Sequence, residues 1–135
     1  MDILTIGLGT IGTTYSYLFN KAGHNVEHYI RKSSKKINIT ELNVDMLDGR
    51  NNKKGEHYTD TYKVNTHTKD NYDFIFISMP AGNIESVIET LNSNNIKGTI
   101  ILCCGIWEDK KYLEKVMQGR EYILGYPVAG GNIVD

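Results

Sequence analysis

The chain has 135 residues, of which 40% are hydrophobic and 23% are charged, and its formal net charge at pH 7 is −1. This length and composition indicate one globular domain with a hydrophobic core, and the small net charge argues against general binding to nucleic acid or to a membrane surface. No apolar run approaches the roughly 20 residues that cross a bilayer, and no basic segment precedes the first predicted strand, so we expect a cytoplasmic protein.

Residues 3–30 show the pattern of a β-α-β unit. Residues 3–6 are an apolar run that predicts a buried strand. The apolar residues from Ile11 to Ala22 recur at the spacing of one helix face, and Gly23 stands where a helix C-cap is expected. Residues 25–30 alternate in polarity and predict a second strand.

Residues 33–70 are polar and carry short alternating stretches. The segment DGRNNKKGE (residues 48–56) is a turn signal between two of these stretches. We expect two or three strands in this region, with a hairpin as one arrangement. The pattern gives little support to a helical crossover.

The second half of the chain alternates predicted strands with predicted helices. The strands are expected at residues 72–79, where Pro80 ends the strand, and at 98–105 and 121–128. The helices are expected at residues 84–91, with Asn83 as N-cap, and at 107–119. This order predicts an α/β fold, namely a Rossmann-like, doubly wound, mainly parallel sheet with helices on both faces.

Three glycines with the spacing GxGxxG follow the first predicted strand and open the first predicted helix. In such a turn the first glycine allows a tight bend, the second lets a pyrophosphate approach the backbone, and the third lets the helix pack closely on the sheet. The phosphates then lie against unpaired N–H groups at the positive end of the helix. We therefore expect a dinucleotide to bind at Gly7, Leu8, Gly9, Thr10, Ile11 and Gly12.

The end of the second predicted strand indicates which dinucleotide binds. NAD-binding domains place an acidic residue here for the ribose 2′-hydroxyl, whereas this strand is followed by Arg31 and Lys32. A guanidinium can bind a 2′-phosphate through two charged hydrogen bonds. Lys35 and Lys36 add positive charge nearby. The sequence therefore favours NADP(H) over NAD, with Arg31 and Lys32 on the 2′-phosphate.

Ligands of parallel α/β sheets bind beyond the carboxyl ends of the strands. Met79, Pro80 and Ala81 lie at the end of the strand predicted at 72–79 and directly after it, so we expect them to contact the cofactor.

The four histidines share no metal-ligand spacing, and His28 is expected to be structural. No metal site is predicted, and no interleaved basic and aromatic residues suggest nucleic-acid binding.

Four segments together resemble the N-terminal half of ketopantoate reductase and, more widely, the 6-phosphogluconate dehydrogenase-like superfamily. They are IGLGTIG (6–12), AGHNVEHYIRK (22–32), YDFIFISMPAGNIESVIETL (72–91) and GTIILCCGIWE (98–108). The resemblance implies an NADPH-binding Rossmann domain over residues 1–135. In a full-length relative it implies reduction of a 2-keto acid, as small-molecule substrate, to a 2-hydroxy acid in pantothenate biosynthesis. It also implies that the C-terminal helical substrate domain of the relatives is absent from this chain.

The chain departs from the family at two positions. Met79 stands where relatives carry a lysine, and Cys104 stands where they carry an asparagine that contacts substrate or nicotinamide. Cys104 is therefore counted among the expected cofactor contacts, but no catalytic residue is predicted. A stand-alone nucleotide-sensing module without catalysis and a reductase of another hydroxy acid remain as alternatives. A homodimer is expected, because a short chain would expose sheet surface that a helical domain covers in relatives.

Overall fold

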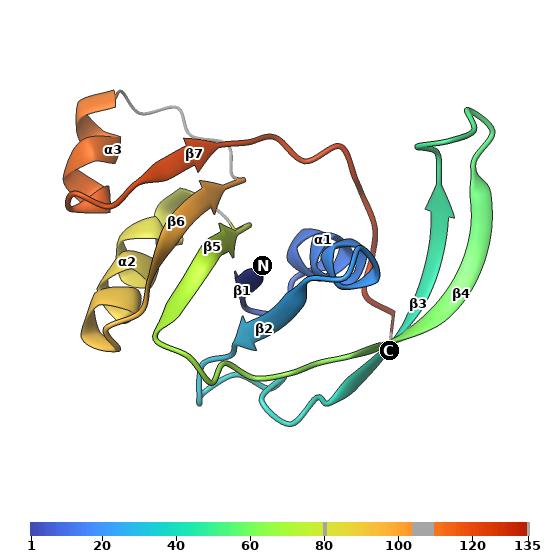
Figure 1. Cartoon of the computed structure of the whole chain (residues 1–135), viewed down its shortest axis with the longest axis horizontal. Helices are drawn as coiled ribbons and strands as arrows, with labels where there is room; N and C mark the ends of the chain where they lie inside the picture. The colour runs from blue at the N-terminus through green and yellow to red at the C-terminus, as the bar shows by residue number, and fades with distance from the viewer. Residues whose placement is uncertain (80, 104–109, 135) are drawn as a thin grey trace.

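The computed structural model describes residues 1–79, 81–103 and 110–134. Among these residues, five strands form one parallel sheet in the order β2-β1-β5-β6-β7 (Figure 1). The strands are β1 (Asp2–Ile6), β2 (Asn25–Tyr29), β5 (Asn71–Ile77), β6 (Lys97–Leu102) and β7 (Tyr122–Leu124). All the strands run in the same direction, but the order in which they are added reverses between β1 and β5, because β2 lies on one side of β1 and the later strands lie on the other. Ligands of such sheets bind at the carboxyl ends of the strands at this switch point.

Helices cover both faces of this sheet. On one face lie α2 (Ile84–Ser93), which a short 3₁₀ turn η1 (Ala81–Asn83) precedes, and α3 (Lys110–Met117). On the other face lies α1 (Thr10–Lys21). The predicted α/β, Rossmann-like fold is therefore confirmed.

The main hydrophobic core lies between the sheet and α2. Ile84, Ile88 and Leu91 recur on one face of α2 and are fully buried, as are Leu4 and Ile75 of the strands beneath them. Burial of side chains of this size contributes about 1.5–3 kcal/mol each. This core fixes α2 beside the carboxyl ends of β1 and β5.

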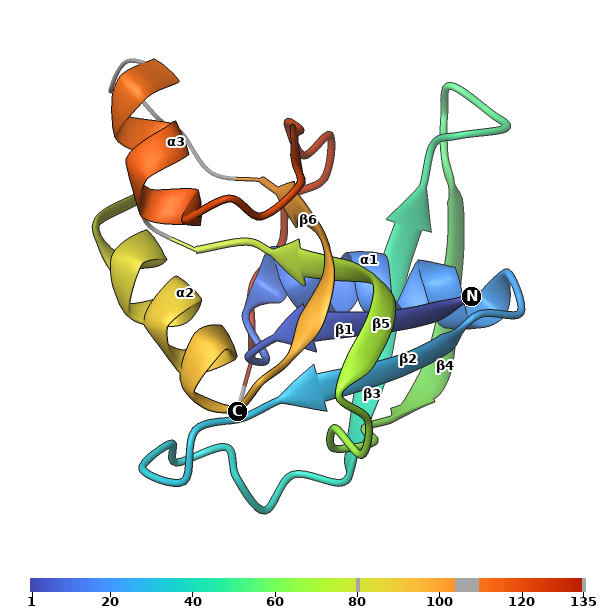
Figure 2. The same ribbon diagram turned by 60° about the vertical axis from the view of Figure 1, so that its left-hand side comes forward.

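Residues 31–70, all of which the structure describes, contain no α-helix. They form an antiparallel hairpin of β3 (Glu41–Asp48) and β4 (Glu56–Lys63), in register from Glu41 opposite Lys63 to Asp48 opposite Glu56. The predicted hairpin is therefore confirmed, with its turn in the segment that carries the turn signal. Figure 2 shows the hairpin standing beside α1, on the side away from α2.

The hairpin packs on α1 through a second hydrophobic cluster. Tyr17 of α1 meets Tyr62 of β4 edge to face, with ring centroids 6.2 Å apart. The Tyr17 hydroxyl also donates to Asp60 at 2.7 Å. These contacts hold the hairpin where a helical crossover would otherwise lie.

Some predicted element bounds differ from the structure. β5 ends at Ile77 and not at residue 79, and β7 covers only 122–124 of the predicted 121–128, because it pairs with β6 only from Ile100 to Leu102. Asn83 occupies the N-cap of α2, but its backbone is helical after η1 and its side chain makes no capping hydrogen bond. The predicted start of the last helix at 107 lies outside the described residues.

In the described part of the chain, every helix is too short or too polar to span a bilayer.

Candidate nucleotide-binding site

The glycine turn leads from β1 into α1. Gly7 has φ +80°, a left-handed conformation that favours glycine, and its N–H donates to the Tyr29 carbonyl at 2.8 Å. Gly9 is the N-cap of α1, and a Cβ atom on it would meet nothing within 4 Å. The backbone at Gly9 is therefore open to a ligand at the helix N-terminus.

The third glycine sets the contact between α1 and β1. A Cβ atom on Gly12 would lie 3.2 Å from Cγ2 of Thr5, so a larger residue would push the helix from the strand. The Thr5 hydroxyl forms a 2.6 Å hydrogen bond with the Ser16 hydroxyl, and both residues are fully buried. These contacts fix the direction of the α1 N-terminus.

His28 of β2 supports the glycine turn through a hydrogen bond to its first residue, Gly7. Its Nδ1 lies 2.8 Å from the Gly7 carbonyl oxygen and its Nε2 lies 2.6 Å from the Tyr62 hydroxyl. A carbonyl only accepts, so Nδ1 carries the proton, and Nε2 accepts from Tyr62 in the neutral ring. Burial lowers the pKa of His28, although the bond to Gly7 opposes this effect. The expectation that His28 is structural fits this placement.

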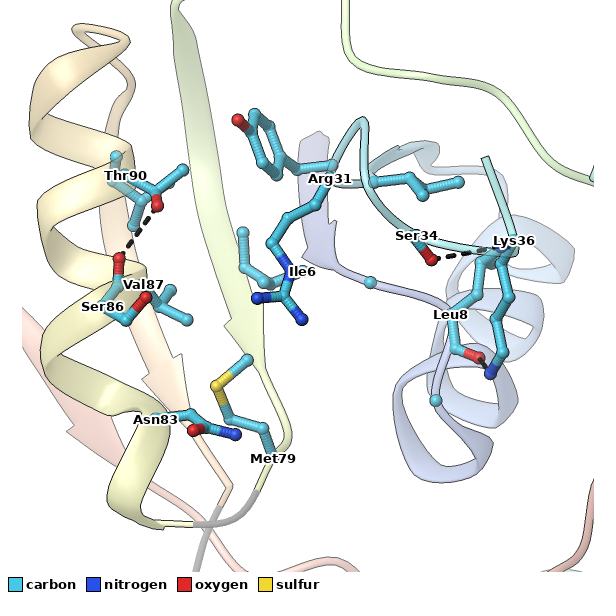
Figure 3. Close-up of a pocket in the computed structure, with 15 residues that line it drawn as sticks. Ile6, Leu8, Arg31, Ser34, Lys36, Met79, Asn83, Ser86, Val87 and Thr90 are labelled. Atoms are coloured by element: carbon cyan, nitrogen blue, oxygen red, sulfur yellow. Dashed lines mark hydrogen bonds between the residues drawn. The ribbon is translucent and has the colours of Figure 1, made fainter. Parts of the chain in front are cut away.

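A cavity of about 270 Å³ opens beside the glycine turn, beyond the carboxyl ends of β1 and β2 and against α2 (Figure 3). One side of it is apolar, with Ile6, Val87 and Leu91. Polar groups from the loop after β2, from η1 and from α2 complete it, namely Arg31, Ser34, Lys36, Asn83, Ser86 and Thr90. The cavity therefore combines an apolar wall with a cationic rim.

Arg31 extends from the end of β2 into this cavity, and Figure 3 shows its guanidinium between the glycine turn and α2. Within the described residues, the guanidinium has neither a hydrogen-bond partner nor a carboxylate within ion-pair distance. A free guanidinium fork can bind two oxygens of a phosphate or carboxylate in parallel. The side chain is thus placed to receive an anion.

Lys36 reaches the same region from the other side. Its ammonium donates to the Leu8 carbonyl at 2.8 Å, and its backbone N–H donates to the Ser34 hydroxyl at 3.1 Å. Leu8 itself is buried. Lys36 therefore places a positive charge directly at the glycine turn.

The predicted site residues fall into three groups. Gly7, Leu8, Gly9, Arg31 and Met79 line the cavity.

Thr10, Ile11 and Gly12 form the first turn of α1, outside the lining, and Lys32 is exposed and also outside it. Ala81 begins η1, whereas Pro80 and Cys104 lie outside the described residues. Of the three residues expected to contact the cofactor after the strand predicted at 72–79, Met79 lines the same cavity as Arg31.

Several cavity residues were not predicted. Ser86 and Thr90 lie one helical turn apart on the face of α2 beside its apolar stripe, so their spacing could have indicated a shared surface. No sequence pattern predicts that Ser34 and Lys36 line the cavity, because the turns between residues 31 and 39 determine where their side chains point. Three or more metal-ligating side chains do not cluster anywhere in residues 1–79, 81–103 and 110–134.

A family model described as "Ketopantoate reductase PanE/ApbA" matches residues 3–125. Among solved structures, the dimeric ketopantoate reductase of Staphylococcus aureus is similar, with 13% identity and a TM-score of 0.59 over 98% of this chain and 45% of that one. The 2-dehydropantoate 2-reductase of Methylococcus capsulatus gives 18% identity and a TM-score of 0.62 over 96% of this chain and 42% of that one. The 2-dehydropantoate 2-reductase of Geobacter metallireducens gives 14% identity and a TM-score of 0.57 over 93% of this chain and 46% of that one.

The chain thus spans less than half the length of each of these three solved chains. A search of curated protein sequences finds no significant match. At these identities the solved structures show a shared fold. The sequence match is more specific, and because it covers residues 3–125 of 135, the chain belongs to the ketopantoate reductase family.

Proposed function

We propose that this chain is the NADPH-binding domain of a ketopantoate reductase-like oxidoreductase. The observation that carries the proposal is the guanidinium of Arg31, which has no partner among the described residues and lies in a cavity that the glycine turn also lines. The 2′-phosphate of NADPH is a dianion that would fit the Arg31 fork, whereas NADH presents a neutral hydroxyl there. Family membership supports the same cofactor class.

The described residues fit the rest of such a nucleotide. The first N–H groups of α1 have no acceptor within the helix, and Gly9 leaves them accessible to a diphosphate. The apolar wall of Ile6, Val87 and Leu91 suits one face of an adenine ring. When bound, NADPH supplies the hydride, and the residues of this chain bind and orient it.

In the whole protein we propose that the hydride passes to a small 2-keto acid, as in the family after which the matched model is named. Met79 favours the alternative of a nucleotide-sensing module, because its thioether lines the cavity at the place where the resemblance implies a lysine. A domain without that lysine would suit a nucleotide-sensing module that catalyses nothing. Turnover of a 2-keto acid with NADPH by the protein would rule out that alternative. The expected homodimer stays a prediction, which light scattering would test.

Titration of the protein with NADPH and NADH tests the cofactor proposal. We expect NADPH to bind at least about tenfold more tightly, because the 2′-phosphate gains charged hydrogen bonds. Arg31→Met should remove this preference and leave NADH binding unchanged. Arg50→Met is the control, since Arg50 lies at the hairpin turn in a pair with Asp48. Equal affinity of the wild-type protein for both nucleotides, or no binding of either, would refute the proposal.

A further inference from the structure

The loop after β2 carries four cations, and the structure separates them by direction. Arg31 and Lys36 line the cavity, whereas Lys32 and Lys35 lie outside it. Lys36 is half-buried, and the other three are exposed to solvent. Successive turns produce this separation, with hydrogen bonds from the Ser34 N–H to the Arg31 carbonyl at 2.9 Å and from the Ile37 N–H to the Ser34 carbonyl at 3.2 Å.

Two hydrophobic anchors hold Lys36 in place. Ile37 and Ile39 pack against the cluster between α1 and the hairpin. The Ile39 N–H also donates to the Lys36 carbonyl at 3.1 Å. These contacts fix the backbone at Lys36 beside the glycine turn, and the hydrogen bond to the Leu8 carbonyl holds the Lys36 side chain in one conformation before any ligand binds. This ordering reduces the conformational entropy that a ligand would have to overcome.

The ammonium of Lys36 retains unused binding capacity. It has three N–H donors, and the Leu8 carbonyl takes one of them. Glu41 and Asp45 line a second cavity with Lys36, but neither lies within 4 Å of its ammonium, and the described residues offer it no other acceptor. The remaining donors and most of the positive charge are thus available at the glycine turn.

The position of Leu8 indicates which phosphate would use these donors. Leu8 stands between Gly7 and Gly9, immediately before the N-terminus of α1, where a dinucleotide places its diphosphate. Arg31 enters the cavity on the other side of the glycine turn, and Figure 3 shows its guanidinium between the turn and α2. We propose that Lys36 binds the diphosphate of the dinucleotide, while Arg31 binds the 2′-phosphate. This assignment rests on the proposed function and divides the two cations by ligand group.

The division has a measurable consequence, because NADPH and NADH share the diphosphate and differ at the 2′ position. Lys36→Met should weaken binding of both nucleotides by a similar factor of about 10. Arg31→Met should weaken only NADPH. Lys36→Arg, which keeps charge and donors, should retain most of the affinity. Lys35→Met removes the same charge one residue away and should change the affinity for either nucleotide by less than about twofold.

Two further readouts separate ligand contact from loop support. The dependence of log Kd for NADH on log salt concentration should become shallower in Lys36→Met, since one charge contact with the ligand is lost. The melting temperature without nucleotide should differ little between the Lys36→Met and Lys36→Arg variants. An unchanged salt dependence with weaker binding would mean that Lys36 only supports the loop, and would overturn the inference.

Other outcomes are equally decisive. If Lys36→Met weakens NADPH but not NADH, Lys36 lies on the 2′-phosphate and the division is wrong. If the wild-type protein prefers NADPH and Lys36→Met binds both nucleotides normally, the inference fails while the proposed function stands. If the wild-type protein binds neither nucleotide, both fail together.

Discussion

Replacing His28 with alanine would test how the glycine turn is held. The imidazole is fully buried and joins the Gly7 carbonyl of the turn to the Tyr62 hydroxyl of the hairpin, at 2.8 Å and 2.6 Å. His28→Ala removes both hydrogen bonds and leaves a void between β2, the turn and β4. The same change should therefore affect the stability of the fold and the geometry of the site.

The magnitude follows from these contacts. A buried carbonyl left without a donor costs about 1–3 kcal/mol. The void left when a buried ring becomes a methyl group adds a further cost of about 2 kcal/mol, at the low end of large-to-small core substitutions. We expect His28→Ala to lower the free energy of unfolding by about 4 kcal/mol, a large part of the stability of a domain of this size.

Urea denaturation followed by circular dichroism at pH 7.5 measures this loss. His57→Ala is the matched control, because His57 pairs with Asp45 on the hairpin and its side chain is 63% exposed. The control should lose no more than about 1 kcal/mol. A loss below about 1 kcal/mol for His28→Ala, or equal losses for both variants, would show that the Gly7–His28–Tyr62 contact does not support the turn.

Two further predictions concern pH and the main core. Burial lowers the pKa of His28 below its value of 6.5 in the unfolded chain, so the unfolded state binds the proton first as the pH falls. The free energy of unfolding should therefore decrease below pH 6.5, by up to about 1.4 kcal/mol per pH unit, until the pH reaches the pKa of His28 in the folded state. Urea denaturation between pH 7.5 and 5 should show this loss in the wild-type protein and not in His28→Gln, and parallel profiles would contradict it. Ile88→Ala should cost about 3 kcal/mol in the same assay at pH 7.5, since Ile88 is fully buried under the sheet, whereas Glu89→Ala on the exposed face of α2 should change stability by less than about 0.5 kcal/mol. Similar losses for these two variants would contradict the assignment of the core.

The sheet and its helices could be predicted because each element carries its own pattern. The stripe of Ile84, Ile88 and Leu91 packs on the same buried strands that appear in the sequence as apolar runs. The bounds were less predictable. β7 is short because only three residues of β6 pair with it, and no local pattern in residues 121–128 contains that information.

The hairpin shows a different limit. Alternation within residues 33–70 and the turn signal at 48–56 predict two or three strands, and the structure has two of them, paired as a hairpin. Their position against α1 depends on contacts between distant residues, such as Tyr17 with Tyr62 and Asp60. The side-chain direction in the basic loop is set in the same way. Its place after the second predicted strand identifies Arg31, but the following turns leave Lys32 outside the cavity and bring Lys36 to it.

The glycine turn itself explains why its surroundings matter for binding. Each of its three carbonyl groups has a donor within the protein: His28 for Gly7, Lys36 for Leu8, and the Thr13 N–H for Gly9. The negative ends of the turn's peptide dipoles therefore point toward protein donors. The N–H groups at the start of α1 are left for an anion, together with the positive end of the helix. A diphosphate would therefore meet N–H donors without competing carbonyls, and loss of either side-chain donor should weaken its binding even where the glycines are unchanged.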